Sequence, residues 1–150
     1  MRISFKIPEG VLTRVKAGVE RRVAEKMDAL AVTIYNSIVT GPQPVWSGAY
    51  ASSWSIGIGS PVVIDNVSPK MARGGPSVTF APAEPLAANL GMTNPYEPIY
   101  ISNYSMRSGD AGVIEGHAGI IENVGSPRHP SPWNIAAHAR NSALQTLRLV

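Results

Sequence analysis

Three histidines, His117, His129 and His138, are the side chains best suited to acid–base or metal chemistry. Glu115 and Glu122 lie near His117, so a carboxylate–imidazole pair is one possible arrangement. A metal site needs three or four convergent ligands, and the histidine spacings of 12 and 9 residues match no metal-binding motif. We therefore interpret the histidines as structural or exposed and expect no metal ion.

Motifs for nucleophilic or cofactor chemistry are missing from the sequence. There is no cysteine, which excludes a disulfide framework, a thiolate zinc site and a cysteine nucleophile. The serines form no Gly-x-Ser-x-Gly elbow. Gly57-Ile58-Gly59 lacks the third glycine of a dinucleotide fingerprint, and no Walker loop occurs. We expect a protein that is not an enzyme and has no cofactor; a hydrolase with His117 or His129 as base is the alternative.

The charged residues are concentrated at the N-terminus. Residues 1–28 contain seven Lys or Arg and four Asp or Glu, and so carry the whole net charge of +3. Overall, only 15% of the residues are charged, against about 25% in a typical domain. This low charge favours a surface that is largely covered by other protein, with a merely polar monomer surface as the alternative.

The N-terminal bases also permit a nucleic-acid-binding function. They are Arg14, Lys16, Arg21, Arg22 and Lys26. Acidic residues alternate with them, which is more typical of a solvated helix face than of a track for phosphates. A DNA- or RNA-binding module remains an alternative and predicts salt-dependent binding.

A long amphipathic helix is the main element that the sequence predicts. Apolar residues recur every three or four positions, as on one face of a helix: Val11, Val15, Val19, Val23, Met27, Leu30, Ile34 and Ile38. Pro8 can begin this helix and Gly41 can end it, which predicts a helix over 9–39 or two helices broken at Gly18. Asp28 and the other charged residues are expected on its solvent face. Such a helix is about 45 Å long, so part of it should contact another molecule.

A strand with one bulky and one small face follows the helix. In 49–60, large side chains alternate with Ala, Ser and Gly, although 47–52 can instead form a helical turn. Trp54, Ile56 and Ile58 are expected in the core, packed on Val23, Met27, Leu30 and Ile34 of the helix. A further strand is predicted at 99–103 and a closing helix at 134–149.

These elements predict one α+β domain over 1–150. It has an N-terminal arm and long helix (1–41), a small, mostly antiparallel sheet with long loops (42–133) and a C-terminal helix (134–150). Loops of this length are usually functional or disordered. We expect 65–98 and 104–112 to be mobile in the free protein, and at least one of them to become ordered against a neighbouring protein. The predicted contact residues are Arg14, Arg21 and Arg22 on the helix, and Phe80, Leu86, Leu90, Met92 and Met106 in the loops.

Three short motifs occur in a recognisable order. Ser47-Gly48-x-Tyr50-x-x-Ser53-Trp54 follows the long helix, Ile121-Glu122-Asn123-x-Gly125 comes later, and Pro130-Ser131-Pro132-Trp133 precedes the last helix. In this order they resemble the tail-completion or neck family of tailed bacteriophages, of the head–tail connector and minor-tail-protein-Z type. The segments 61–98 and 105–116 depart from the family pattern.

The resemblance implies a structural virion protein that forms a ring, expected to be a hexamer, between the head connector and the tail tube. Its partners would be further copies of itself, head-completion or connector proteins, and tail-terminator or tail-tube proteins. DNA would pass through the lumen without sequence recognition. The protein would be assembled in the host cytoplasm and located in the neck of the virion. No membrane contact is expected, because the longest uncharged run, 29–64, contains Asn, Gln and Pro. A generic interaction module is a further alternative.

Overall fold

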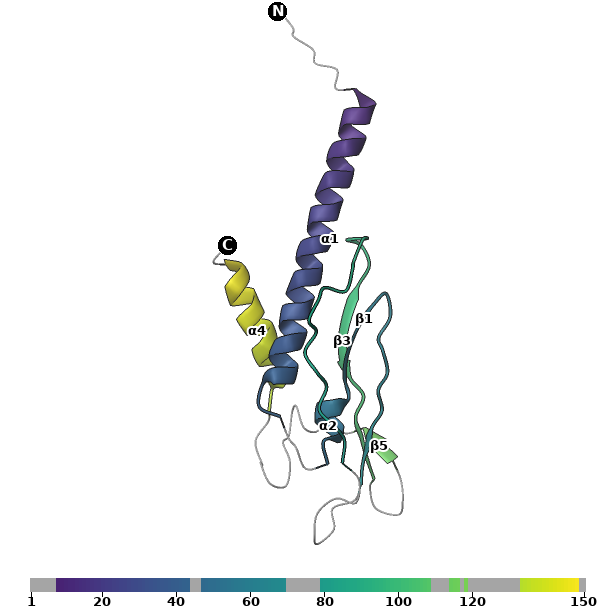
Figure 1. Cartoon of the computed structure of the whole chain (residues 1–150), viewed down its shortest axis with the longest axis vertical. Helices are drawn as coiled ribbons and strands as arrows, with labels where there is room; N and C mark the ends of the chain where they lie inside the picture. The colour runs from purple at the N-terminus through teal and green to yellow at the C-terminus, as the bar shows by residue number, and fades with distance from the viewer. Residues whose placement is uncertain are drawn as a thin grey trace, which may run out of the picture.

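The computed structural model describes residues 8–43, 47–69, 79–108, 114–116, 118 and 133–148. They form an α+β arrangement in which a long N-terminal helix lies between a small sheet and a C-terminal helix (Figure 1). None of the helices in these ranges combines the length and the apolar character needed to cross a bilayer.

The long helix, α1, comprises Glu9–Thr40 and continues without a break through Gly18. Pro8 stands at its N-cap with φ −59°, a value that suits a helix start. At the other end, the Gly41 N–H donates to the Ile38 carbonyl at 3.2 Å. The helix predicted over 9–39 is confirmed, and the alternative of a break at Gly18 is wrong.

Two short sheets lie on one side of α1. Strand β1 (Trp54–Ile58) pairs antiparallel with β3 (Ile99–Asn103). The second sheet has the order β2-β4-β5, formed by β2 (Val67–Ser68), β4 (Met106–Ser108) and β5 (Ile114–Gly116). Its β2–β4 pair is parallel and its β4–β5 pair antiparallel.

The sheet region partly matches the sequence-based expectations. The strand at 99–103 is confirmed, and the helical turn weighed for 47–52 is present as α2 (Ala49–Ser52), so the strand begins at Trp54. The 104–112 segment, expected to be a loop, contains β4 in its described part. The small face of β1 is closely covered, since a Cβ on Gly57 would lie 2.5 Å from the Ser60 carbonyl oxygen.

The core lies at the C-terminal end of α1. The buried cluster consists of Tyr35, Ile38, Val39, Tyr50, Trp54, Ile135 and Ala139. The Tyr50 and Trp54 rings meet edge to face, with centroids 5.7 Å apart. Ile34 and Ile56 pack against the cluster, so the expected core positions of Trp54, Ile56 and Ile34 are confirmed.

Three of the four expected packing partners on α1 lie outside the core, one to three helical turns from Ile34. Val23 is exposed, Met27 and Leu30 are half-buried outside the core cluster, and Ile58 is half-buried at the end of β1. The cause is the short path from α1 to β1, which places Trp54 beside the last turns of the helix. The Tyr35 hydroxyl donates to the Trp54 carbonyl at 3.4 Å.

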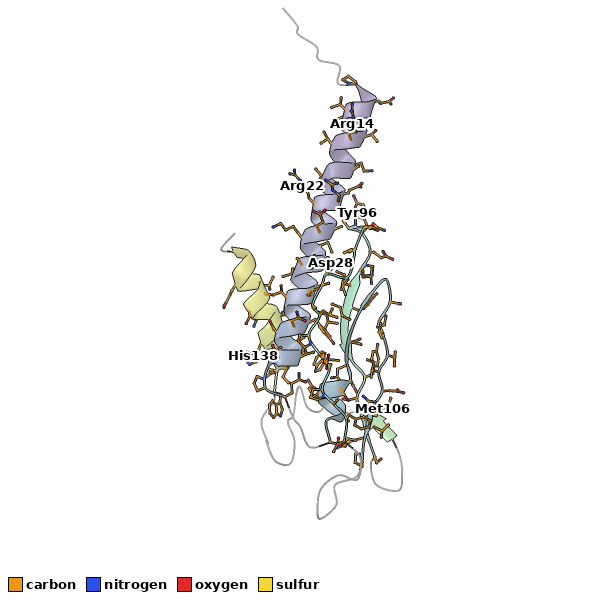
Figure 2. All side chains as sticks on the ribbon, in the orientation of Figure 1. Arg14, Arg22, Asp28, Tyr96, Met106 and His138 are labelled. Carbon is orange, nitrogen blue, oxygen red and sulfur yellow. The ribbon has the colours of Figure 1, made fainter. Side chains whose placement is uncertain are left out.

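The closing helix, α4 (Ile135–Arg148), packs against α1 and confirms the prediction for 134–149. Ile135, Ala139 and Ala143 are buried and recur every four residues, as one helix face requires. His138 lies on the exposed side of this helix (Figure 2).

Candidate functional site

Residues 79–98 form an extended segment, which we call the strap, that runs beside α1 in the opposite direction. Near the core, the Asn36 side-chain amide donates to the Leu86 carbonyl at 3.0 Å and accepts from the Leu86 N–H at 2.7 Å. At the far end, the Tyr96 hydroxyl donates to Glu20 Oε1 at 3.0 Å (Figure 2). Side chains of α1 therefore hold the strap at Leu86 and again at its tip, Tyr96.

The centre of the strap is held by Asp28, which is only 3% exposed. Its carboxylate accepts backbone N–H hydrogen bonds from Leu90 at 2.8 Å, Gly91 at 2.8 Å and Met92 at 2.9 Å. Gly91 has φ +80°, a left-handed conformation that favours glycine and helps three successive amides converge. Hydrogen bonds to an ionised acceptor are about twice as strong as neutral ones, so Asp28 is the main attachment of the strap.

Two of our expectations are corrected by these contacts. Asp28, expected on the solvent face of α1, is buried because the strap covers it. The segment 65–98 was expected to be mobile in the free protein, but its part 79–98 is held on its own helix by Asn36 and Glu20 as well as by Asp28. Eight helix residues rise about 12 Å, so successive attachments at 36, 28 and 20 are within reach of the extended strap.

The strap tip also affects an ionisable group. The hydrogen bond to Glu20, together with the negative charge of that carboxylate, raises the pKa of Tyr96 above its ordinary value. In the core, burial raises the pKa of Tyr35.

The first family-like motif has a structural role at its beginning. The Ser47 carbonyl accepts from the Phe80 N–H at 2.8 Å, and the Ser47 hydroxyl is 2.8 Å from that of Ser68. Gly48 has φ +75°, and a Cβ there would lie 2.1 Å from the Phe80 carbonyl oxygen. These contacts anchor the start of the strap beside α2.

The rest of that motif builds the junction between α2 and β1. The Ser53 hydroxyl, fully buried, donates to the Ala49 carbonyl at 2.7 Å. Tyr50 packs on Trp54, and its carbonyl accepts from the Asn103 side chain at 2.8 Å. The motif is thus explained by packing, hydrogen bonding and one left-handed glycine.

The N-terminal half of α1 extends beyond the rest of the described structure (Figure 1). It carries an apolar stripe that we define as Leu12, Val15, Val19 and Val23, which are 53%, 59%, 56% and 43% exposed. Spacings of three and four residues place these side chains on one face. Exposed apolar residues are unremarkable singly, but four in a row on one helix face mark an interaction surface.

The stripe continues into a shallow, open groove on the surface of α1. Its lining consists of Val19, Val23, Met27 and Leu30 together with Arg22 and Lys26. The groove is therefore apolar with two cationic side chains, a composition suited to an apolar segment that also carries carboxylates.

The bases of α1 differ in their pairing. Lys16 lies 3.8 Å from Glu20, and Arg21 lies 3.7 Å from Glu25, each one turn along the helix. Within the described ranges, Arg22 and Lys26 take part in no ion pair. Their charges are available to a partner that docks on the stripe.

The structure distributes the predicted contact residues over three places. Arg14, Arg21 and Arg22 are exposed on the N-terminal half of α1. Figure 2 shows Arg14 beyond the strap tip at Tyr96, whereas Arg22 is about level with that tip, since Tyr96 contacts Glu20. Along the strap, Phe80, Leu86 and Leu90 are half-buried, and Met92 is only 6% exposed. Met106 is half-buried in β4, where it pairs with Val67 of β2.

Sequence reasoning missed the polar residues that hold the strap, namely Glu20, Asp28, Asn36 and Tyr96. Their only signal was the spacing of eight residues between positions 20, 28 and 36. The apolar stripe was recognised, but its innermost residue, Val23, was assigned to the chain's own core.

The candidate catalytic residues are mostly outside the structural description. His117, His129 and Glu122 lie outside the described residues, as does the side chain of Glu115. Among the described residues, no group of three His, Asp or Glu side chains is placed to hold a metal ion.

No family model, curated protein or solved structure matches this chain. The resemblance to the phage neck family therefore rests on the three short sequence motifs. The structural features that bear on function are the exposed N-terminal half of α1 and the strap.

Proposed function

We propose that this chain is a structural protein of the neck of a tailed bacteriophage. Copies of it form a ring, a hexamer in our proposal, that joins the head connector to the tail tube. Head-completion or connector proteins lie on one side of the ring, and tail-terminator or tail-tube proteins on the other. DNA passes through the lumen without being read, and the ring acts by shape and contact and not as an enzyme.

The observation that carries this proposal is the protruding, apolar half of α1. Fully burying one Val or Leu side chain is worth about 1.5–3 kcal/mol relative to exposure. Valine is also a poorer helix former than alanine. The exposed valines at 15, 19 and 23 therefore neither stabilise the helix by propensity nor interact favourably with water. A contact in an assembly accounts for both their type and their exposure.

The distribution of charge agrees with this proposal. In the described ranges, 47–69 and 79–108 contain only four charged residues, Asp65, Glu84, Glu97 and Arg107. Surfaces with few charges suit a permanent interface of roughly 1,000 Å² or more, because burying a charge without a partner costs free energy.

The test is electron microscopy of particles from cells that express the phage genome with this gene inactivated. We expect capsids and tails that are complete but unjoined, and joined particles when the gene is supplied from a plasmid. Joined, infectious particles without the gene would overturn the proposal.

A nucleic-acid-binding function is the second candidate, and the unpaired Arg22 and Lys26 favour it. It predicts that the isolated protein binds duplex DNA and that the affinity falls steeply between 50 and 200 mM salt, by about tenfold or more. Replacing both bases by Gln would reduce the slope of that salt dependence. Absence of salt-dependent binding would exclude this candidate.

A further inference from the structure

The apolar stripe lies on the side of α1 opposite the attachment of the strap at Asp28. Val19 of the stripe and Asp28 are nine residues apart, which is about two and a half turns and therefore places them on opposite sides of the helix. The four stripe residues are 43% to 59% exposed, including Val23, which lies level with the strap. A second surface can thus cover the stripe without displacing the strap.

The charges beside the stripe change sign along α1. Glu9 is exposed one turn before Leu12, and Lys26 is exposed one turn beyond Val23. Within the described ranges, neither charge takes part in an ion pair. The stripe therefore has an acidic outer end and a basic inner end.

A second copy of the same helix, laid antiparallel on the stripe, covers its apolar residues. If Val15 lies opposite the partner's Val19, then Leu12 lies opposite the partner's Val23 to within one residue, since antiparallel helices advance by equal steps in opposite directions. Each match occurs twice in the pair, so the two stripes cover one another. The first turn of the partner's helix then lies along the groove beside Val23 and Met27.

The charges match in the same register. Glu9 faces the partner's Lys26 at each end of the pair, so both charges gain an opposite charge. Near the middle, Lys16 and Glu20 are already 3.8 Å apart within one helix, and the antiparallel direction brings Lys16 close to the partner's Glu20 as well. A parallel pair in register would instead place Lys26 against Lys26 and Arg22 against Arg22, and such like charges oppose contact.

Gly18, near the centre of this pair, agrees with a close approach of two helices. Glycine weakens the interior of a helix, and a Cβ on Gly18 would meet nothing within 4 Å. The chain's own fold therefore does not require glycine at this position. In the antiparallel register, the missing side chain leaves room beside Val15 for the partner's helix.

We propose that two copies of the free protein pair antiparallel through the N-terminal halves of α1, with Val15 of each copy on Val19 of the other and Glu9 of each on Lys26 of the other. Such a pair is two-fold symmetric and closes on itself. The copies in the proposed ring all point the same way along its axis, so the pair belongs to the protein before assembly. In the ring, the stripe exchanges the second copy for another surface.

Reversal of the charges at the two ends of the stripe tests both the pair and its direction. In E9K a lysine faces Lys26 of the partner at both ends, and in K26E a carboxylate faces Glu9 of the partner. Sedimentation equilibrium up to millimolar concentration should show a dimer for the wild type. Each variant alone should dimerise about tenfold more weakly.

Two combinations of these variants should recover dimerisation. An equimolar mixture of E9K and K26E restores opposite charges at both ends, and so does the double variant E9K/K26E by itself. Residues 9 and 26 of one chain are about 25 Å apart along α1. Recovery therefore cannot come from a contact within one chain, nor from a parallel pair in register.

E84K and R140E are the matched controls. They change the net charge by the same amounts as E9K and K26E, at exposed positions outside α1, and should dimerise like the wild type. Circular dichroism should show the same helix content for all variants, because every substitution is at an exposed position.

The outcomes separate the pair from the neck function. A wild type that stays monomeric at millimolar concentration, single reversals without effect, or combinations that stay as weak as the single variants would each overturn the pair. If the pair fails while joined particles still need the gene, the neck function stands. If the charge reversals behave as expected but particles join without the gene, the pair stands and the neck function fails.

Discussion

Asp28 Oδ2 accepts a hydrogen bond from the backbone N–H of Gly91 at 2.8 Å, although 63 residues separate the two in sequence. The Leu90 and Met92 amides complete the same site. A single buried carboxylate thereby fixes the middle of the strap on α1. The first prediction follows from this contact.

Replacing Asp28 by Ala leaves three backbone donors without their acceptor. We expect a loss of about 3 kcal/mol in the free energy of unfolding, measured by urea denaturation. Hydrogen exchange of the Leu90, Gly91 and Met92 amides should become faster. Asp65→Ala, at an exposed carboxylate, is the control and should change neither measurement. Unaltered exchange in the Asp28 variant would show that the carboxylate does not hold the strap.

Two glycines with similar backbone angles provide a matched comparison. Gly48 has φ +75° and Gly91 has φ +80°, but only at Gly48 would a Cβ meet a backbone atom, the Phe80 carbonyl oxygen. Gly91→Ala should cost about 1–2 kcal/mol, from the left-handed conformation alone. Gly48→Ala should cost about 3 kcal/mol or more, since the backbone must move. Thermal denaturation of both variants checks this order, and equal losses would contradict the close contact at Phe80.

Alkaline pH should release the tip of the strap. The pKa of Tyr96 is raised because its neutral hydroxyl donates to Glu20. A group whose pKa is raised in the folded state contributes stability below its unfolded pKa of 10.0 and loses that contribution as pH rises through the folded value. Ultraviolet titration should show Tyr96 and the buried Tyr35 ionising late in the wild type, and Glu20→Gln should shift the ionisation of Tyr96 alone to lower pH. An unshifted titration would indicate that the two side chains do not interact.

The apolar stripe should contribute to association but not to folding. Val15→Gln/Val19→Gln replaces exposed β-branched residues with a better helix former, so the melting temperature should stay the same or rise slightly. Self-association should weaken about tenfold or more, since the contact loses apolar area. Val63→Gln is the control, because Val63 and Val15 are both 59% exposed. Equal association of the two variants would exclude the stripe as a contact.

The sequence predicted α1 but did not predict the strap. Local spacing predicted α1 and α4 within a residue or two, because helix periodicity and end signals lie within the helix itself. Spacing does not show which turns of a long apolar face the core covers, and the assignment of Val23 to the core failed for that reason. Trp54 was placed correctly because the alternation of large and small residues puts it on the bulky face of β1, which is the face that a sheet turns toward its core.

The strap could not be predicted because its order depends on contacts between distant parts of the chain. Residues 79–98 lack periodicity, and Asp28 and Asn36 look like ordinary polar residues of a helix. Only when the chain folds back do their side chains meet backbone groups at 86 and 90–92. The low charge and the long helix indicated a contact surface, whereas its place on the apolar stripe required the structure.

The central claim is tested most directly by a cryo-electron microscopy reconstruction of the neck of the intact particle. We predict a closed ring of this chain between connector and tail tube, with Val15 and Val19 of each copy buried against a neighbouring copy. A neck that lacks the chain, or a single copy whose N-terminal half of α1 is surrounded by solvent, would contradict it.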